Sequence, residues 1–205
     1  MRATSLPLPP VVFHVLALVF FGGCAAWLVL ESQMLGGRRG WMAVAVAVAS
    51  VGAALLSLAT LVALLRARAL VVLGIRAPVG AYLQALAVVG LLMLLGVHLV
   101  YSEARPALGS FCLGLAVWLG ALGLHLVPGL YLAQDGFIDL LGRRTRFAEL
   151  EWFSLEKGEG APPRVVLQVG RGTSLRLEAR LTQDAVEGVK GRLLQAGLSA
   201  RARGR

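Results

Sequence analysis

Four long apolar stretches constrain this chain more than any other feature of its sequence. They cover residues 11–30, 41–65, 79–101 and 108–132, and none of them contains Asp, Glu, Lys or Arg. Each reaches the ~20 residues that a helix needs to cross ~30 Å of hydrocarbon. Backbone polar groups in lipid must be satisfied within the segment, so helix is the form that these stretches must take. The sequence therefore predicts four transmembrane helices over these ranges, with the first over about 8–30.

The charged residues divide the chain into two parts. Only Glu31 and Glu103 precede Asp135, although the chain has 11 acidic residues. Hydrophobic residues make up 58% of the chain, against roughly 45–50% in soluble domains. We therefore predict a four-helix transmembrane domain over 1–132 and a small water-facing domain over 133–198. The basic residues 199–205 are expected to form a disordered tail.

The basic residues also predict the orientation. Arginines follow the second and fourth stretches, whereas the opposite loops have a weaker basic content. Because cytoplasmic loops carry the excess of Lys and Arg, both termini are expected in the cytoplasm and the protein in a bacterial inner (plasma) membrane. Phe21-Gly22-Gly23-Cys24 distantly resembles a lipoprotein cleavage site, but the apolar run continues beyond Cys24, which favours an uncleaved helix. The arginines concerned are Arg66, Arg68, Arg76, Arg143, Arg144 and Arg146.

Two histidines, His14 and His125, fall inside the first and fourth predicted helices. We expect both at a similar depth, roughly 10 Å below the cytoplasmic surface. Such a pair could ligate a haem iron or handle a proton. The other interpretation, which we favour, is a neutral imidazole bound to a partner helix or to a backbone carbonyl such as the one that Pro128 frees. No cofactor is therefore expected, and a small haem b or quinone-linked electron-transfer subunit is the alternative.

From Leu130 onward the sequence pattern changes from helix to short strands. Gly136, Gly142 and the segment 170–173 mark turns, and we expect positive φ angles at both Gly170 and Gly172. After these strands a helical pattern covers about 183–196, and Gly197 is the expected stop. The strands that we expect cover 130–134, 137–141, 145–148, 152–156, 164–169 and 174–180.

Three segments of this region resemble the bacterial membrane-anchored pleckstrin-homology-like (PH-like) domains. They are Leu132-x-x-Asp135-Gly136-Phe137, Arg143-Arg144-Thr145-Arg146 and the stretch 147–155. The resemblance covers about a third of the chain. It implies an α+β module in which a C-terminal helix plugs a bent antiparallel sheet, and it implies binding or scaffolding without catalysis.

The candidate surface for a protein partner or for membrane lipid consists of Arg143, Arg144, Arg146 and Trp152. Arg144-Thr145-Arg146 is similar to the basic loop with which some PH domains bind phosphorylated lipids. We favour a topological role for these arginines, as positive residues just inside a membrane helix. A protein partner is expected at Trp152 and at an open edge of the sheet.

Motifs of enzymes and of metal sites are missing from the sequence. A dense basic stripe with interleaved aromatics is missing too, so we expect no nucleic-acid partner despite the net charge of +9. We therefore expect a non-enzymatic accessory, assembly or scaffold component of the membrane.

Overall fold

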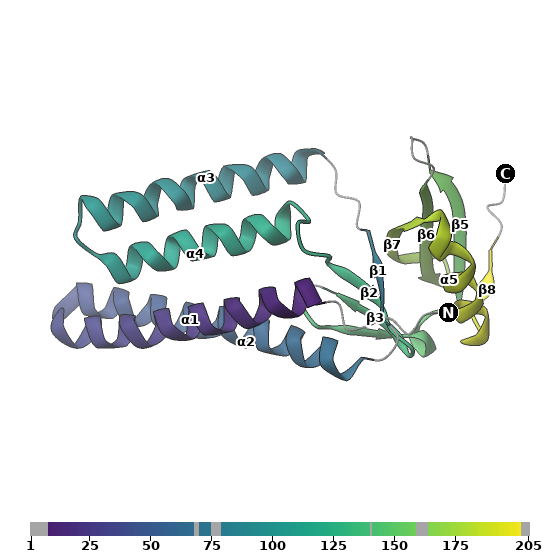
Figure 1. Cartoon of the computed structure of the whole chain (residues 1–205), viewed down its shortest axis with the longest axis horizontal. Coiled ribbons are helices and arrows are strands. Elements are labelled where there is room, and N and C mark those ends of the chain that lie inside the picture. Colours follow the sequence, from purple (N-terminus) through teal and green to yellow (C-terminus); the bar gives the residue numbers. More distant parts are fainter. Residues whose placement is uncertain (1–7, 68–69, 75–78, 140, 159–163, 202–205) are drawn as a thin grey trace. The chain divides into compact units, whose positions relative to one another are not determined.

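The computed structural model describes residues 8–67, 70–74, 79–139, 141–158 and 164–201 (Figure 1). The chain divides into two compact units. The helical unit comprises Pro7–Val62 and Ala77–Val127, and the sheet unit comprises Ala63–Arg76 and Pro128–Arg205. The sheet unit therefore includes a segment between the second and third helices, although the sequence predicts a transmembrane domain over all of residues 1–132.

Four helices in the described residues are long and apolar enough to cross a membrane, as the sequence predicts. They are α1 (Leu8–Met34), α2 (Gly37–Arg66), α3 (Val79–Tyr101) and α4 (Pro106–Gly123). α3 has the predicted bounds, whereas α1 and α2 extend beyond theirs. The last turn of α2 belongs to the sheet unit.

α4 ends nine residues before the predicted bound, at Gly123. The helix is closed by two hydrogen bonds, from the N–H of His125 to Leu122 O (3.1 Å) and from the N–H of Leu126 to Ala121 O (2.9 Å). These two bonds form a Schellman motif, whose left-handed residue is His125 at φ 54°. The prediction of a helix through Leu132 was wrong because the last of its apolar residues belong to a strand.

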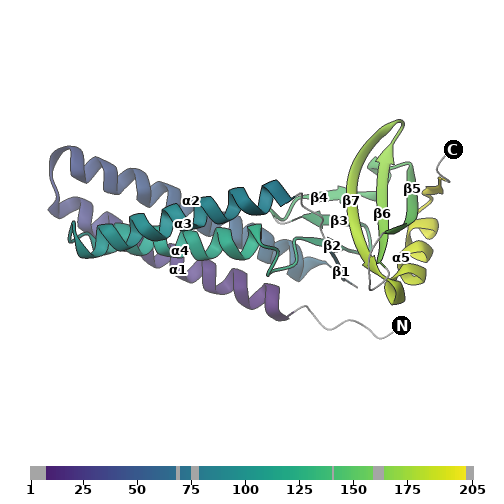
Figure 2. The same ribbon diagram turned by 90° about the horizontal axis from the view of Figure 1, so that it is seen from above.

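Small residues bring the backbones of α3 and α4 together in the helical unit (Figures 1 and 2). A Cβ atom added at Gly109 of α4 would lie 2.8 Å from the carbonyl oxygen of Gly96 on α3. α1 packs on α4 through aromatic rings, with Phe21 at the centre and 1% exposed. Its ring contacts those of Phe111 and Trp118 edge-on, at centroid distances of 6.1 and 5.8 Å.

Two polar contacts add to this helix packing. The hydroxyl of Ser50, on α2, donates to Phe21 O of α1 at 2.8 Å. Near the end of α1, Glu31 accepts a hydrogen bond of 3.4 Å from Nε of Arg105, the residue directly before α4. Both side chains of this ion pair are largely buried, and it joins α1 to α4.

The sheet unit contains two four-stranded sheets, which are antiparallel except for the parallel pair of β5 with β8. The first sheet has the order β1-β2-β3-β4, and the second has the order β7-β6-β5-β8. Gly74, next to β1, and Arg180 on β7 exchange two backbone hydrogen bonds of 2.9 and 2.6 Å, which connect the sheets. The strands are β1 (Val71–Leu73), β2 (Leu130–Leu132), β3 (Gly136–Asp139), β4 (Arg144–Arg146), β5 (Trp152–Gly158), β6 (Arg164–Arg171), β7 (Ser174–Thr182) and β8 (Ser199–Ala200).

Strands β2 and β3 are buried on both faces. Leu130, Leu132 and Phe137 face the main core, which they share with residues of β5–β7. On the other face, Tyr131 and Ile138 pack with residues 63–64 in the last turn of α2. Strands covered on both sides are apolar at every position, which explains why this segment resembles the end of a helix in the sequence.

The second sheet is closed by helix α5 (Gln183–Gln195), in agreement with the predicted helix over about 183–196. Val189 and Leu193 of α5 are buried in the main core. Gly197, at φ 83°, ends the helix in a Schellman motif, in which Leu198 N–H donates to Leu193 O at 3.1 Å.

Three local predictions in this region were wrong. Strand β4 ends at Arg146, and Phe147–Glu149 form a 3-10 turn. Of the two turn glycines, Gly172 has a positive φ of 55°, whereas Gly170 lies within β6. Residues 199–200, predicted as disordered tail, form β8 and pair in parallel with β5, and residues 202–205 lie outside the described part of the chain.

Candidate functional site

Arg144 connects the first sheet to the end of α2. Its Nη2 atom donates to the carbonyl oxygen of Ala63 at 3.4 Å, and its Nη1 atom lies 3.6 Å from Asp135 Oδ2. A cation near the C-terminus of a helix is stabilised by the helix dipole. Arg144 therefore holds β4 against the last turn of an apolar helix.

Three further arginines lie around this contact, and each is exposed. Arg66 follows Ala63 by one helical turn, on the same face of α2. Arg146 lies on the same face of β4 as Arg144. Arg143 lies in the turn directly before β4. Among the described residues, no carboxylate lies within ion-pair distance of Arg66, Arg143 or Arg146. We refer to Arg66, Arg143, Arg144 and Arg146 as the arginine surface.

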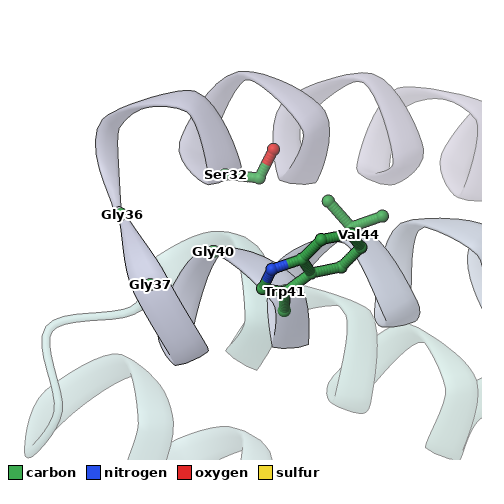
Figure 3. Close-up of a pocket in the computed structure, with 6 residues that line it drawn as sticks. All are labelled: Ser32, Gly36, Gly37, Gly40, Trp41 and Val44. Atoms are coloured by element: carbon green, nitrogen blue, oxygen red, sulfur yellow. The ribbon is translucent and has the colours of Figure 1, made fainter.

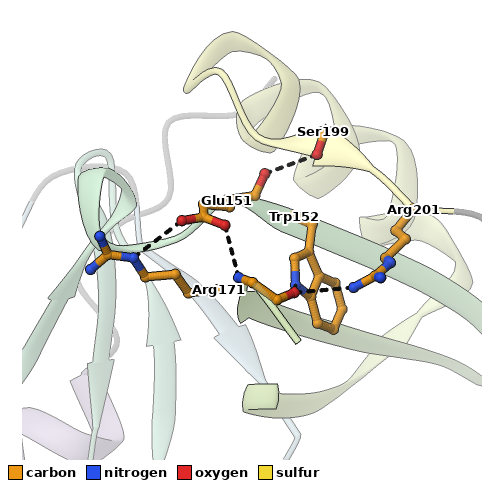
Figure 4. Close-up of polar contacts among 6 residues, drawn as sticks. Glu151, Trp152, Arg171, Ser199 and Arg201 are labelled. Atoms are coloured by element: carbon orange, nitrogen blue, oxygen red, sulfur yellow. Dashed lines mark hydrogen bonds and ion pairs between the residues drawn. The ribbon is translucent and has the colours of Figure 1, made fainter. Parts of the chain in front are cut away.

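Trp152 is half-buried and held by contacts within the sheet unit (Figure 4). Its Nε1–H donates to Gly172 O at 2.8 Å, and the guanidinium of Arg201 lies 5.2 Å from the ring centroid. A Cβ atom at Gly170 would collide with the indole, so glycine is needed there for the ring to lie across β6. The structure therefore gives this predicted partner residue a packing role.

Glu151 joins three segments beside this tryptophan (Figure 4). Its carboxylate accepts hydrogen bonds from Gly172 N–H (2.8 Å) and Arg171 Nε (3.2 Å), in the β6–β7 turn. Its carbonyl oxygen accepts hydrogen bonds from the backbone N–H and the hydroxyl of Ser199, both at 3.0 Å. The Gly172 N–H and the Arg171 guanidinium lower the pKa of the Glu151 carboxyl. We refer to Glu151, Trp152, Arg171, Gly172 and Arg201 as the turn clamp.

The edge of β5 is partly covered. Trp152 and Phe153 pair with Ser199 and Ala200 of β8, and the N–H of Arg201 donates to Phe153 O at 2.7 Å. From Ser154 to the end of β5, its partner among the described strands is β6 alone. The open edge expected from the sequence therefore begins only at Ser154.

The two histidines have different neighbours. His14 is 2% exposed on α1, and its ring contacts that of Phe13 at 5.3 Å. His125 lies beyond the last residue of α4, and its ring contacts that of Tyr82 on α3 at 5.5 Å. The structure shows no contact between the two imidazoles, and the similar depth expected for them assumed a longer α4. Nδ1 of His14 and both ring nitrogens of His125 are buried without a hydrogen-bond partner in the described part of the chain.

A hollow of about 220 Å³ lies at the turn between α1 and α2 (Figure 3). Its lining contains no acidic, histidine or cysteine side chain, and the hydroxyl of Ser32 already donates to Val29 O at 2.6 Å. The hollow therefore has no group that could perform acid–base chemistry or bind a metal. It is lined by Ser32, Gly36, Gly37, Gly40, Trp41 and Val44.

Sequence reasoning missed two strands of the sheet unit, β1 and β8, and with β8 the position of Arg201. Strand β1 has three residues and lies more than fifty residues before its partner β2, so no local pattern marks it. β8 has two residues, and Arg201 follows it in a stretch that reads as a basic tail. A strand of that length shows no alternation, which is the signal on which strand prediction depends.

Comparison with known proteins identifies no relative. No protein-family model, curated protein or solved structure matches this chain.

Proposed function

We propose that this protein is a non-enzymatic, multi-pass membrane protein whose sheet unit is a PH-like docking module. The module serves a protein partner or the anionic lipid surface, and the protein acts as an accessory, assembly or scaffold component. We place the protein in a bacterial inner membrane with both termini in the cytoplasm. The observation that carries this proposal is the packing of β2 and β3 on the last turn of α2, beside the arginine surface.

The order of elements supports a PH-like identity. Antiparallel strands come first, and α5 then packs Val189 and Leu193 into the core that the strands share. A C-terminal helix that plugs a bent sheet is what the sequence resemblance implies. The strand β1, contributed from between two membrane helices, is an addition to that plan.

The position of the arginine surface supports docking at the membrane. Residues 63–66 end an apolar helix, so a module that packs on them lies close to the lipid headgroups. Basic residues near an anionic membrane surface each contribute about 1 kcal/mol of attraction. Because the module cannot diffuse away, a weak contact is repeated at high effective concentration.

Docking of the sheet unit on anionic lipid is tested by hydrogen exchange on the full chain in nanodiscs. Exchange of the β4 amides should slow when phosphatidylglycerol replaces part of the phosphatidylcholine, because headgroups bind at the arginine surface. Arg143→Gln with Arg146→Gln should remove this protection. The matched control is Arg176→Gln with Lys190→Gln, a pair of exposed residues on β7 and α5 that removes the same charge. Equal protection in both double variants would contradict lipid docking at this surface.

Binding of a protein partner by the sheet unit is tested by affinity capture in mild detergent. A partner that depends on the module should be lost from the Arg143/Arg146 variant and kept by the Arg176/Lys190 variant. Orientation is tested separately, by labelling a cysteine introduced at Ser199 in intact cells and in opened cells. Labelling from outside intact cells would contradict a cytoplasmic module.

A further inference from the structure

Helix α3 is the least buried of the four long apolar helices. In its most apolar stretch 6% of the residues are buried, against 28% in α1 and 44% in both α2 and α4. Its main neighbour is α4 (Figure 1). The side of α3 that meets α4 carries Ala85, Val89, Gly96 and Val100, which lie close to glycines of that helix. Most of the remaining surface of α3 is therefore left to lipid or to another molecule.

One exposed face of α3 has the spacing of a helix-pairing seam. Its residues recur at alternating steps of four and three, and each of them is exposed. At 3.6 residues per turn, they lie about half a turn away from the side that meets α4. Residues with this spacing face the partner helix in coiled coils and in left-handed membrane bundles. We refer to this face as the α3 seam, which consists of Gly80, Gln84, Ala87, Leu91, Leu94, His98 and Tyr101.

Gln84 places a polar group inside this otherwise apolar seam. It lies five residues after the first residue of α3, a helix of 23 residues. Such a helix is about 34 Å long and Gln84 is about 8 Å along it, so this residue lies within the ~30 Å hydrocarbon core. His98, the other side chain of the seam that could donate or accept a proton, lies near the opposite end of α3 and has Glu103 at 3.9 Å.

The carboxamide of Gln84 is exposed and forms no hydrogen bond within the described part of the chain. An amide in hydrocarbon without hydrogen bonds is unfavourable, because lipid tails offer it neither a donor nor an acceptor. Whatever covers the α3 seam must therefore supply both a donor and an acceptor at the depth of Gln84.

A second copy of this chain meets that requirement. The carboxamide has an N–H donor and an oxygen acceptor, so two identical carboxamides can each donate to the other. Two copies inserted in the same orientation are related by a two-fold axis along the membrane normal. Their α3 helices then run parallel and bring the two Gln84 side chains to equal depth. Gly80 and Ala87, the neighbours of Gln84 in the seam, are small and leave room for close approach of the two backbones.

We propose that two copies of this protein pair through the α3 seam, with the two Gln84 carboxamides hydrogen-bonded to each other across the two-fold axis. A single polar residue in an apolar seam fixes the register of the paired helices. The proposal rests on α3 as a membrane-spanning helix, so it does not depend on the docking function of the sheet unit.

Cysteine cross-linking of the full chain in membranes tests the position of the seam. Ala87→Cys should give a disulfide-linked dimer with copper phenanthroline, because a disulfide requires Cα atoms within about 7 Å. Leu86→Cys is the matched control, since Leu86 is 51% exposed at nearly the same depth but lies outside the seam. Both variants keep Cys24 and Cys112, which are buried. Equal cross-linking of the two variants, or none in either, would overturn pairing through this face.

A second pair of variants tests the amide. Gln84→Leu keeps an exposed side chain of similar size, and should raise the dissociation constant of the dimer about threefold to twentyfold, as measured by energy transfer between labelled copies in mild detergent. Gln84→Asn keeps a self-complementary carboxamide and should retain more of the pairing than Gln84→Leu. An unchanged dissociation constant in Gln84→Leu would show that headgroups or water already satisfy the amide. A monomeric chain that pairs through α3 with another protein would show a different partner, and either result overturns the proposal.

Discussion

The helical unit and the sheet unit bury different kinds of side chain. The packed positions of the helical unit are rich in alanine and glycine, such as Ala47, Ala54 and Gly109. The main core of the sheet unit consists largely of leucine, phenylalanine and valine, with Leu167 and Val169 fully buried. In lipid, burying a large apolar side chain gains little because the tails are equally apolar, and close backbone approach stabilises the packing. In water, the apolar area removed from solvent is what stabilises the core. The two units therefore respond to opposite changes in side-chain size.

The largest effect is expected from shortening a buried side chain of β1. Leu73 is 1% exposed in the main core although it lies in the chain between two of the four long apolar helices. Leu73→Ala should destabilise the sheet unit by about 2–5 kcal/mol, through lost burial and the cavity that remains. Hydrogen exchange of the β2 and β7 amides in the full chain measures this change. Val72→Ala, at an exposed position of the same strand, should have little effect, and equal effects of the two would contradict the placement of β1.

Adding a single methyl group should be harmful in the helical unit. Gly109→Ala would place a Cβ atom against Gly96 O and Val100, and should cost about 1–3 kcal/mol of helix packing. Unfolding by SDS titration in mixed micelles measures this change. Gly90→Ala on α3 is the control, since nothing lies within 4 Å of its added Cβ atom and alanine favours helix by about 0.5–1 kcal/mol. Stabilisation by both variants would show that close approach of α3 and α4 is not required.

His125 occupies a left-handed position that normally favours glycine. His125→Gly should therefore stabilise the end of α4, by up to about 1 kcal/mol relative to His125→Ala, which keeps the unfavourable φ. Thermal unfolding of the two variants gives the difference. A loss of stability in both variants would show that the imidazole has a role.

A Soret band that disappears with either His14→Ala or His125→Ala would support the alternative of a shared haem.

The smallest effect is expected from acid at the turn clamp. The pKa of Glu151 is lowered in the folded protein, so its contribution to stability is present above the ordinary carboxyl value of 4.5 and is lost as the pH falls through the lower folded value. Tryptophan fluorescence should therefore change below pH 4.5. Protonation of Glu151 weakens its hydrogen bond from Gly172 N–H, and Gly172 is also the residue whose carbonyl oxygen accepts the hydrogen bond from Trp152. Glu151→Gln should remove this change. Trp152→Phe shows how much of the signal comes from the clamp, and an unchanged transition in Glu151→Gln would exclude this carboxyl as its cause.

The sequence predicted the parts of this fold that depend on local patterns. α3 and α5 were placed within a residue or two. α3 is an uninterrupted apolar run of membrane-spanning length, and α5 has a helical pattern that ends at Gly197. The strand that begins at Leu130 was predicted, but the end of α4 was misplaced, because the apolar run continues from α4 into β2, which is buried on both faces. β1 and β8 were missed because two or three residues carry no pattern, and their partners lie far along the chain.

The candidate surfaces were predicted less completely. The sequence placed Arg143, Arg144 and Arg146 near the end of a helix, but it gave no reason to single out Ala63 as the contact of Arg144. Trp152 was predicted to contact a protein partner. In the structure its Nε1–H donates to Gly172 O, and its ring lies beside the guanidinium of Arg201. Such pairings depend on tertiary register, which no local window of the sequence contains.

We expect residues 71–74, which lie in the chain between two helices, to tolerate no change of length, although connections between helices usually tolerate insertions. Val71 and Leu73 point into the core and Val72 points away from it. One residue inserted before Val71 would exchange these two sets of side chains, since a slip of one position reverses the faces of a strand. It would also shift Gly74 away from Arg180, where the two sheets join. Insertions and deletions in this short segment should therefore be as damaging as those within a core strand.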